Sequence, residues 1–164
     1  MKSKIYVALI DEGTTVWRPV SAIQIRDHIY QIDPNAGVPP DENWEFIPGS
    51  YVACEEYQFA DFTGKVAYAE AQLSPAGRFS YTRPITNHHK YSNAIFRENS
   101  VGIYIQFYDT EGRCLRDSLQ DSFALAESDF QDVTRNQEVE QGADGKPPEV
   151  AQPPHKLNPN TRLP

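Results

Sequence analysis

The sequence lacks a long hydrophobic segment and contains little cysteine. Its most compact apolar run, residues 5–10, is far shorter than the ~18 apolar residues that a membrane span needs, and it is too short for a secretory signal with its cleavage site. The only cysteines are Cys54 and Cys114. We therefore expect a cytoplasmic protein with no membrane partner, in which both thiols are reduced and buried.

The sequence is also short of positive charge. Fifteen Lys and Arg residues stand against 23 Asp and Glu, which gives a formal net charge of −8. Non-specific binding to nucleic acid or to an anionic membrane needs a positive field, so we expect no direct nucleic-acid partner. The acidity fits plain solubility. It also fits an acidic surface that faces a basic protein partner or mimics a polyanion.

Motifs for known catalytic chemistries are missing as well. There is no phosphate-binding loop, dinucleotide fingerprint, nucleophile elbow or zinc-ribbon spacing. His88 and His89 have no Cys or acidic residue at ligand spacing, so we expect a solvated loop there and no metal. Glu55 and Glu56 would project from opposite faces of a strand, and Cys54 is expected to be a buried structural thiol. We predict no catalytic residue and no cofactor.

The first half does contain short runs of β-branched and aromatic residues. A Pro- and Gly-rich loop over residues 33–43 interrupts them. The runs that predict strands lie at residues 5–10, 16–25, 28–32, 44–46, 51–59 and 66–73. Five or six short strands and one long loop predict a mainly β fold, with a small SH3-like barrel or roll over residues 1–73. Closure of this kind removes exposed sheet edges.

The second half, residues 74–140, is predicted to be a β-rich extension that follows a turn at residues 74–77. A hairpin at residues 109–113, with Gly112 in a left-handed conformation, joins its last two strands. The expected strands are residues 79–85, 101–108 and 114–119, and residues 94–97 form a run too short to assign.

Two interpretations fit the residues beyond 119. Helical spacing is found in Leu115, Leu119, Phe123 and Phe130, whereas Leu119, Phe123 and Leu125 also fit a continued strand. Ser128 with Gln131 forms a capping box that would open a helix over residues 129–141. We favour a strand followed by a short helix.

Residues 141–164 contain no aromatic residue and hold six of the chain's 13 prolines. Such a segment cannot bury enough apolar surface to offset the entropy of ordering it. Its Pro-Pro pairs favour extended polyproline II geometry. We expect a disordered tail, or a tail that becomes ordered on a partner.

Aromatic residues with polar neighbours, and one acidic turn, supply the candidate binding residues: Asp11, Glu12, Trp17, Arg18, Trp44 and Glu45. The acidic turn falls short of the 6–8 oxygens of a Ca²⁺ site. Both tryptophans fit a barrel core. They also fit a partly exposed aromatic groove that holds an extended peptide, because Trp is rarely fully buried.

Several short runs of the first half occur in a recognisable order. They are residues 7–14 (VALIDEGT), residues 16–20 (VWRPV), Trp44-Glu45-Phe46, Pro48-Gly49, Val52 and Cys54-Glu55-Glu56. Together they resemble a group of short bacterial proteins with no assigned activity, over about residues 4–73. The resemblance implies a bacterial origin and a small barrel, and it implies no function. It does not extend past Leu73, so specialised function is expected in the added half.

Three functions are compatible with these features. The preferred hypothesis is a non-catalytic protein-binding module with an acidic surface, such as an immunity- or antitoxin-like inhibitor. The second is an accessory subunit of a larger bacterial assembly, with the Pro-rich tail wrapped on a neighbour. The third is a small enzyme that uses Cys54 or a histidine.

Overall fold

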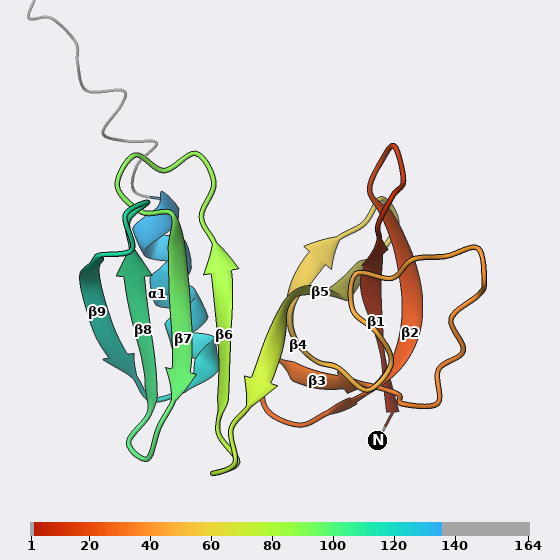
Figure 1. Cartoon of the computed structure of the whole chain (residues 1–164), viewed down its shortest axis with the longest axis horizontal. Helices are drawn as coiled ribbons and strands as arrows, with labels where there is room; N and C mark the ends of the chain where they lie inside the picture. Colours follow the sequence, from red (N-terminus) through yellow and green to blue (C-terminus); the bar gives the residue numbers. More distant parts are fainter. Residues whose placement is uncertain (1, 136–164) are drawn as a thin grey trace, which may run out of the picture.

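The computed structural model describes residues 2–135 and is mainly β (Figure 1). The described residues form nine strands and one helix: β1 (Lys2–Leu9), β2 (Val16–Gln24), β3 (Ile29–Ile32), β4 (Tyr51–Gln58), β5 (Thr63–Leu73), β6 (Phe79–Pro84), β7 (Asn93–Glu98), β8 (Ile103–Tyr108), β9 (Cys114–Gln120) and α1 (Phe123–Arg135). The mainly β fold class is therefore confirmed. No helix in this part of the chain is long and apolar enough to cross a membrane. The predicted tail, residues 141–164, lies outside the described residues.

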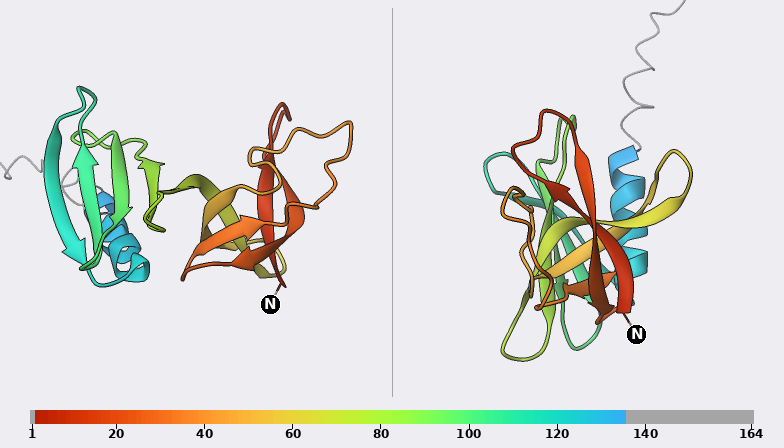
Figure 2. Two further views of the ribbon diagram at one scale, coloured as in Figure 1. Left: turned by 60° about the horizontal axis from the view of Figure 1, so that its bottom comes forward. Right: turned by 90° about the vertical axis from the view of Figure 1, so that its right-hand side faces the viewer.

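The strands pair in chain order, each antiparallel to the next, and the first five close on themselves. Closure comes from β1, which pairs with β2 along its length and meets β5 in parallel at Tyr6 and Val66. Figure 2 shows this ring and the later strands as two lobes, with β5 running between them. The finer assignment of an SH3-like barrel stays a prediction.

The ring encloses a hydrophobic core of its own. Alternate residues of β1 and β2 point inward because side chains alternate along a strand. Burying each large aliphatic side chain contributes about 1.5–3 kcal/mol. The buried members are Ile5, Val7, Val20, Ala22, Tyr30, Ile32, Trp44, Phe46, Val52, Cys54 and Ala67.

Residues 44–46 do not begin a strand, so that prediction was wrong. Trp44 makes one isolated antiparallel bridge with Leu9. A turn at Gly49, where φ is +92°, follows at once, so β4 begins only at Tyr51. The two aromatic side chains of the segment nevertheless close one part of the ring's core.

The second lobe is an antiparallel sheet of β6 to β9 with α1 packed against one face (Figure 1). The helix begins at Phe123 rather than at residue 129, and the strand does not continue to residue 125. Ser122 caps the helix, since its Oγ accepts the Leu125 N–H at 3.3 Å. The buried residues of α1 are Phe123, Ala126 and Phe130, which share one helical face. This stripe outweighs the capping signal at Ser128.

Other expectations for the second lobe had mixed outcomes. Residues 94–97, a run too short to assign from the sequence, lie in a full strand because β7 pairs with a neighbour on both sides. Gly112 has a φ of +78°, as the hairpin prediction required. Cys114 is exposed and not buried, because it opens the edge strand β9.

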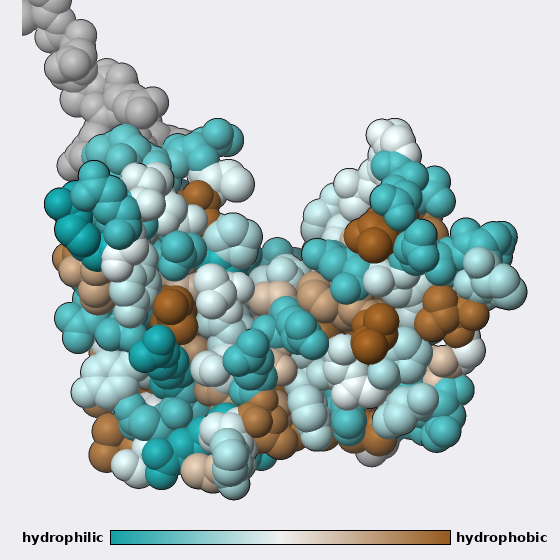
Figure 3. Space-filling view, in the orientation of Figure 1, coloured by the Kyte–Doolittle hydropathy of each residue, from teal (hydrophilic) through white to brown (hydrophobic). Residues whose placement is uncertain are grey.

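A second hydrophobic core crosses from one lobe to the other. Ile29, Ala53 and Ala69 of the ring pack in the same cluster as Phe79 and Phe96 of the second lobe. The turn between β5 and β6, where the domain boundary is predicted, is thus spanned by continuous apolar packing. Polar residues cover most of the face seen in Figure 3, where the surface is hollowed between the lobes.

Candidate functional site

Two of the predicted binding residues, Arg18 and Trp44, both donate hydrogen bonds to Glu42, a residue that the sequence pattern did not single out. The Arg18 Nε–H donates to Glu42 Oε2 at 2.8 Å, and a second guanidinium nitrogen contacts Oε1. The Trp44 indole N–H donates to Oε2 at 2.9 Å. These bonds satisfy Glu42 and pin the long loop to β2. Arg18 and Trp44 therefore help to hold the long loop in place.

Asp11, Glu12 and Glu45 are all exposed. Asp11 has a φ of +70°, and its Oδ2 accepts a hydrogen bond from the Asn43 side-chain amide at 3.0 Å. This contact joins the β1–β2 turn to the long loop. Glu45 donates its backbone N–H to the Ala8 carbonyl at 2.9 Å, and partial burial raises the pKa of its carboxyl group. The acidic turn and Glu45 do not converge on one pocket.

Trp17 lies elsewhere, in a group of five rings that we call the aromatic cluster: Tyr6, Trp17, Tyr57, Phe59 and Phe62. Phe59 is its centre. The Phe59 ring stacks on Phe62 with centroids 4.6 Å apart, and lies 4.9 Å from the rings of Tyr6 and Tyr57. Trp17 sits 5.8 Å from Tyr57. The rings come from β1, β2 and the β4–β5 hairpin, so ring closure brings them together.

Gly64 lets the aromatic cluster pack closely against β5. A Cβ at this position would lie 2.9 Å from Tyr6 Cε2 and 3.0 Å from Phe59 Cε2. The cluster is only partly covered, since the Tyr57 and Phe62 side chains are each 45% exposed. Of the two predicted tryptophans, one is core and one belongs to a surface aromatic patch.

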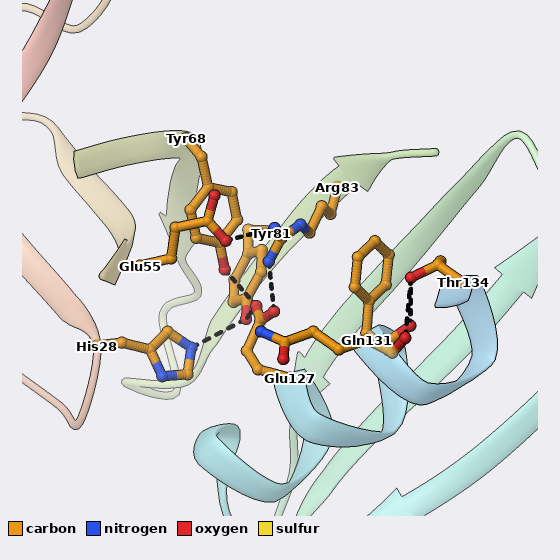
Figure 4. A network of polar contacts seen from close by, with 9 residues as sticks. His28, Glu55, Tyr68, Tyr81, Arg83, Glu127, Gln131 and Thr134 are labelled. Atoms are coloured by element: carbon orange, nitrogen blue, oxygen red, sulfur yellow. Dashed lines mark hydrogen bonds and ion pairs between the residues drawn. The ribbon is translucent and has the colours of Figure 1, made fainter. Parts of the chain in front are cut away.

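A second candidate, the junction network, joins the lobes and is drawn in Figure 4. Its centre is the Glu127 carboxylate on α1. The Tyr81 hydroxyl donates to Glu127 Oε1 at 2.5 Å, and the Tyr68 hydroxyl donates to the same oxygen. Arg83 donates to Oε2 at 2.6 Å. His28 Nε2 lies 2.9 Å from the Tyr81 oxygen.

Arg83 is the cation of the junction network. One of its N–H groups reaches Glu127 and another reaches Glu55 on β4. The guanidinium carbon lies 4.3 Å from the centroid of the Tyr68 ring and 4.6 Å from that of Phe130. The planar cation thus fills the space between two rings while pairing with a carboxylate from each lobe.

The electrostatics of the junction network favour one set of protonation states. Burial raises the pKa of the Tyr68 and Tyr81 phenols, and the Glu127 carboxylate adds to this effect. Burial lowers the pKa of His28. Burial disfavours the charged form of Arg83, but Glu127 and Glu55 outweigh it and raise its pKa. A neutral His28 donates from Nε2 to Tyr81, so every hydrogen-bonding group at the centre has a partner.

The other chemical candidates are buried or hydrogen-bonded within the fold. Cys54 is 4% exposed, and burial raises its pKa to about 12, so it carries almost no nucleophilic thiolate at neutral pH. His88 Nδ1 accepts the backbone N–H groups of Lys90 and Tyr91 at 3.2 and 2.9 Å. Within residues 2–135, no group of three or more His, Cys, Asp and Glu side chains is placed to hold a metal ion.

Among residues 2–135, two of the clefts lie away from both candidates. One, of about 570 Å³, lies beside the start of α1, and its Arg26 is 3.5 Å from Glu98. The other, of about 360 Å³, lies beside His88, and its Arg113 pairs with Asp109 at 2.8 Å. In both clefts the arginine already has a carboxylate partner, so neither offers an unpaired arginine for recognition.

Comparison with known proteins adds no assignment: no family model, curated protein or solved structure matches the chain. The site therefore rests on its geometry. The strongest signal missed in the sequence was the aromatic content of residues 57–62, where Tyr57, Phe59 and Phe62 fall at a predicted strand end and turn. Three aromatic residues at a hairpin tip are more than a solvated turn requires.

Proposed function

We propose that the chain is a non-catalytic protein-binding module whose recognition surface is the aromatic cluster. The observation that carries this proposal is the grouping of five rings with Tyr57 and Phe62 each 45% exposed. Single exposed apolar side chains are ordinary on a protein surface, whereas grouped aromatic ones are typical of interfaces. Tyr and Trp also contribute strongly to binding once an interface covers them.

The charge around the aromatic cluster favours a basic partner. Glu56 and Asp61 are exposed and stand next to Tyr57 and Phe62 in the chain. The net charge of −8 adds a long-range attraction for a positively charged protein. An immunity- or antitoxin-like inhibitor of a basic protein is one concrete form of this function.

The test is co-purification from the source cells with the tagged full chain, followed by affinity measurement on the recovered partner. The double variant Tyr57→Ser/Phe62→Ser removes the exposed rings without opening the buried cores. We expect its affinity to fall at least about tenfold, since truncating one central interface residue costs ~2 kcal/mol. The association rate of the unaltered chain should fall steeply with added salt.

Val101→Ser is the matched control, because Val101 is 67% exposed and lies on the second lobe, away from the cluster. It should leave the affinity unchanged. A partner that binds the double variant as tightly as the unaltered chain would refute the aromatic cluster as the recognition surface. An association rate that does not change with salt concentration would refute the proposal that charge attracts the partner.

A further inference from the structure

The ligand chemistry that suits the aromatic cluster is an extended, proline-rich segment. Polyproline II has no internal hydrogen bonds and is already ordered, so it loses little entropy on docking against aromatic side chains. Trp17 and Tyr57 lie side by side, with ring centroids 5.8 Å apart, and Phe62 stacks on Phe59 beyond them. Flat apolar rings of this kind pack against the pyrrolidine rings of proline.

The chain carries such a segment outside the described residues. Pro147, Pro153 and Pro159 recur at a spacing of six residues, and Pro148 and Pro154 repeat that spacing. Polyproline II has three residues per turn, so residues six apart share one edge, about 19 Å from one another. The sequence therefore favours a single proline-bearing edge in this segment.

The segment is also complementary to the hairpin in charge. Although the whole chain has a net charge of −8, residues 146–164 hold three basic residues and one acidic residue: Lys146, Lys156, Arg162 and Glu149. The β4–β5 hairpin presents the exposed carboxylates of Glu56 and Asp61 beside its aromatic side chains. The prolines of the segment are therefore accompanied mainly by positive charges, and the rings of the hairpin by negative ones.

We infer that residues 146–164 bind the aromatic cluster of their own chain and compete there with the partner. The inference rests on the proposed function in treating the cluster as a recognition surface. In polyproline II geometry, the stretch from Arg135 to Pro153 spans up to about 56 Å. Each lobe has about 60–70 residues, for which a compact body has a radius of gyration of about 11 Å, so this stretch is long enough to pass from α1 on the second lobe to the ring. The tether also gives the segment a high effective concentration, which favours its own chain over a second copy.

The test places a nitroxide spin label on the segment of the full chain, in the variant Cys114→Ser/Gln152→Cys. The remaining thiol, Cys54, is buried with a pKa of about 12, so labelling is selective for position 152. The label should lower the NMR signal intensities of the backbone amides of residues 57–63 about twofold or more. This loss should not depend on protein dilution, because the contact is intramolecular. The signals of residues 99–102 on the second lobe should stay unchanged.

Two sets of substitutions separate the contact from chance encounters. Replacing Pro147, Pro148, Pro153 and Pro154 by Ala keeps the charges and should abolish the signal loss, as should Tyr57→Ser/Phe62→Ser. Val101→Ser should preserve it. Equal loss at residues 57–63 and 99–102 would overturn the inference. So would loss that disappears on dilution, which would assign the contact to a second copy.

The outcomes distinguish this inference from the proposed function. If no signal is lost at residues 57–63 but the double variant still fails to bind the partner, the inference falls and the proposed function stands. If the segment binds the cluster but the partner's affinity does not depend on Tyr57 and Phe62, the surface serves the tail alone and the proposed function falls. Tighter partner binding by the Pro→Ala variant than by the unaltered chain supports both.

Discussion

The aromatic cluster and the junction network differ in which kind of side chain they expose to water and which they bury. The cluster leaves large rings such as Tyr57 and Phe62 partly in water. The junction network takes a charged pair, Arg83 and Glu127, largely out of it, with 16% and 14% of their side chains exposed. Each arrangement departs from the usual partition of apolar inside and charged outside. The two departures have different consequences.

A buried charge is stable only when every one of its hydrogen-bond and charge partners is present. The junction network therefore forms only when both lobes are folded. Partly exposed rings have no such requirement. Folding removes only part of their apolar area from water, so a ligand that covers the remaining area gains further hydrophobic stabilisation. The comparison therefore fits structural cohesion for the network and the recognition role that we propose for the cluster. Four substitutions test that assignment, from the largest expected effect to the smallest.

Replacing the cation of the junction network should cost the most stability. Arg83→Met leaves the carboxylates of Glu55 and Glu127 without their charge partner, and we expect a loss of about 3–5 kcal/mol in the free energy of unfolding. Urea titration at neutral pH measures it. Arg97→Met, at an exposed arginine of the adjacent strand, is the control and should change stability by less than about 0.5 kcal/mol. Equal effects in the two variants would contradict a cohesive network.

The network should also make stability depend on pH. Burial lowers the pKa of His28 below its unfolded value near 6.5, so the unfolded chain takes up a proton first as pH falls. His28 thus contributes stability that is complete above that pH and is lost as pH falls toward its folded pKa. One group contributes at most about 1.4 kcal/mol per pH unit.

His28→Gln keeps a donor for Tyr81 and should flatten the pH dependence of unfolding below pH 6.5, as measured by urea titrations across the range. His88 also has a pKa lowered by burial, with His89 adding to the effect, so His88→Gln is the comparison variant. A slope that changes only in His88→Gln would show that the network does not titrate in this window.

Packing beneath the aromatic cluster should have a smaller effect. The added methyl group of Gly64→Ala would lie 2.9 Å from Tyr6 Cε2, so the half-exposed rings must shift outward. We expect a loss of about 1 kcal/mol, at the low end for overpacking because ring edges on a surface can move. Near-ultraviolet circular dichroism should change along with it. Gly13→Ala, where nothing lies within 4 Å, should alter neither quantity.

Removing an exposed ring should affect stability least. Phe62→Ser should change the free energy of unfolding by less than about 1 kcal/mol, because the side chain is 45% exposed and its area is only partly buried. Urea unfolding measures this directly, beside Phe96→Ser at a fully buried ring as the positive control. A loss at position 62 as large as that at position 96 would make Phe62 a core residue and remove it from the recognition surface.

Much of the fold could be predicted from local pattern. The runs at residues 16–25 and 51–59 coincide closely with β2 and β4, and the run at residues 5–10 overlaps β1, which begins three residues earlier, since alternation and turn residues act over a few positions. The start of α1 was missed because Phe123 and Ala126 show their helical role only once β6–β8 supply a surface to cover. The prediction of a strand at residues 44–46 was wrong for a similar reason, since the aromatic side chains of this segment cover a core although its backbone does not extend a sheet.

The candidate site was only partly predictable. The sequence singled out Trp17, but its ring neighbours Tyr57 and Phe59 are some 40 positions away in the chain. Glu42 was missed because its partners, Arg18 and Trp44, lie in β2 and in the long loop. Sequence spacing carries no information about such contacts until the ring closes.

By itself, the sequence determined the mainly β class, most strand positions, the acidic charge and the proline-rich composition of the tail. These are properties of short segments, where alternation, turn chemistry and composition act locally. Only the tertiary structure decided which residues meet: five rings over Gly64 at the ring's seam, and Glu127 against Tyr68, Tyr81 and Arg83 at the junction. Those encounters depend on strand closure and lobe packing, which bring together residues dozens of positions apart.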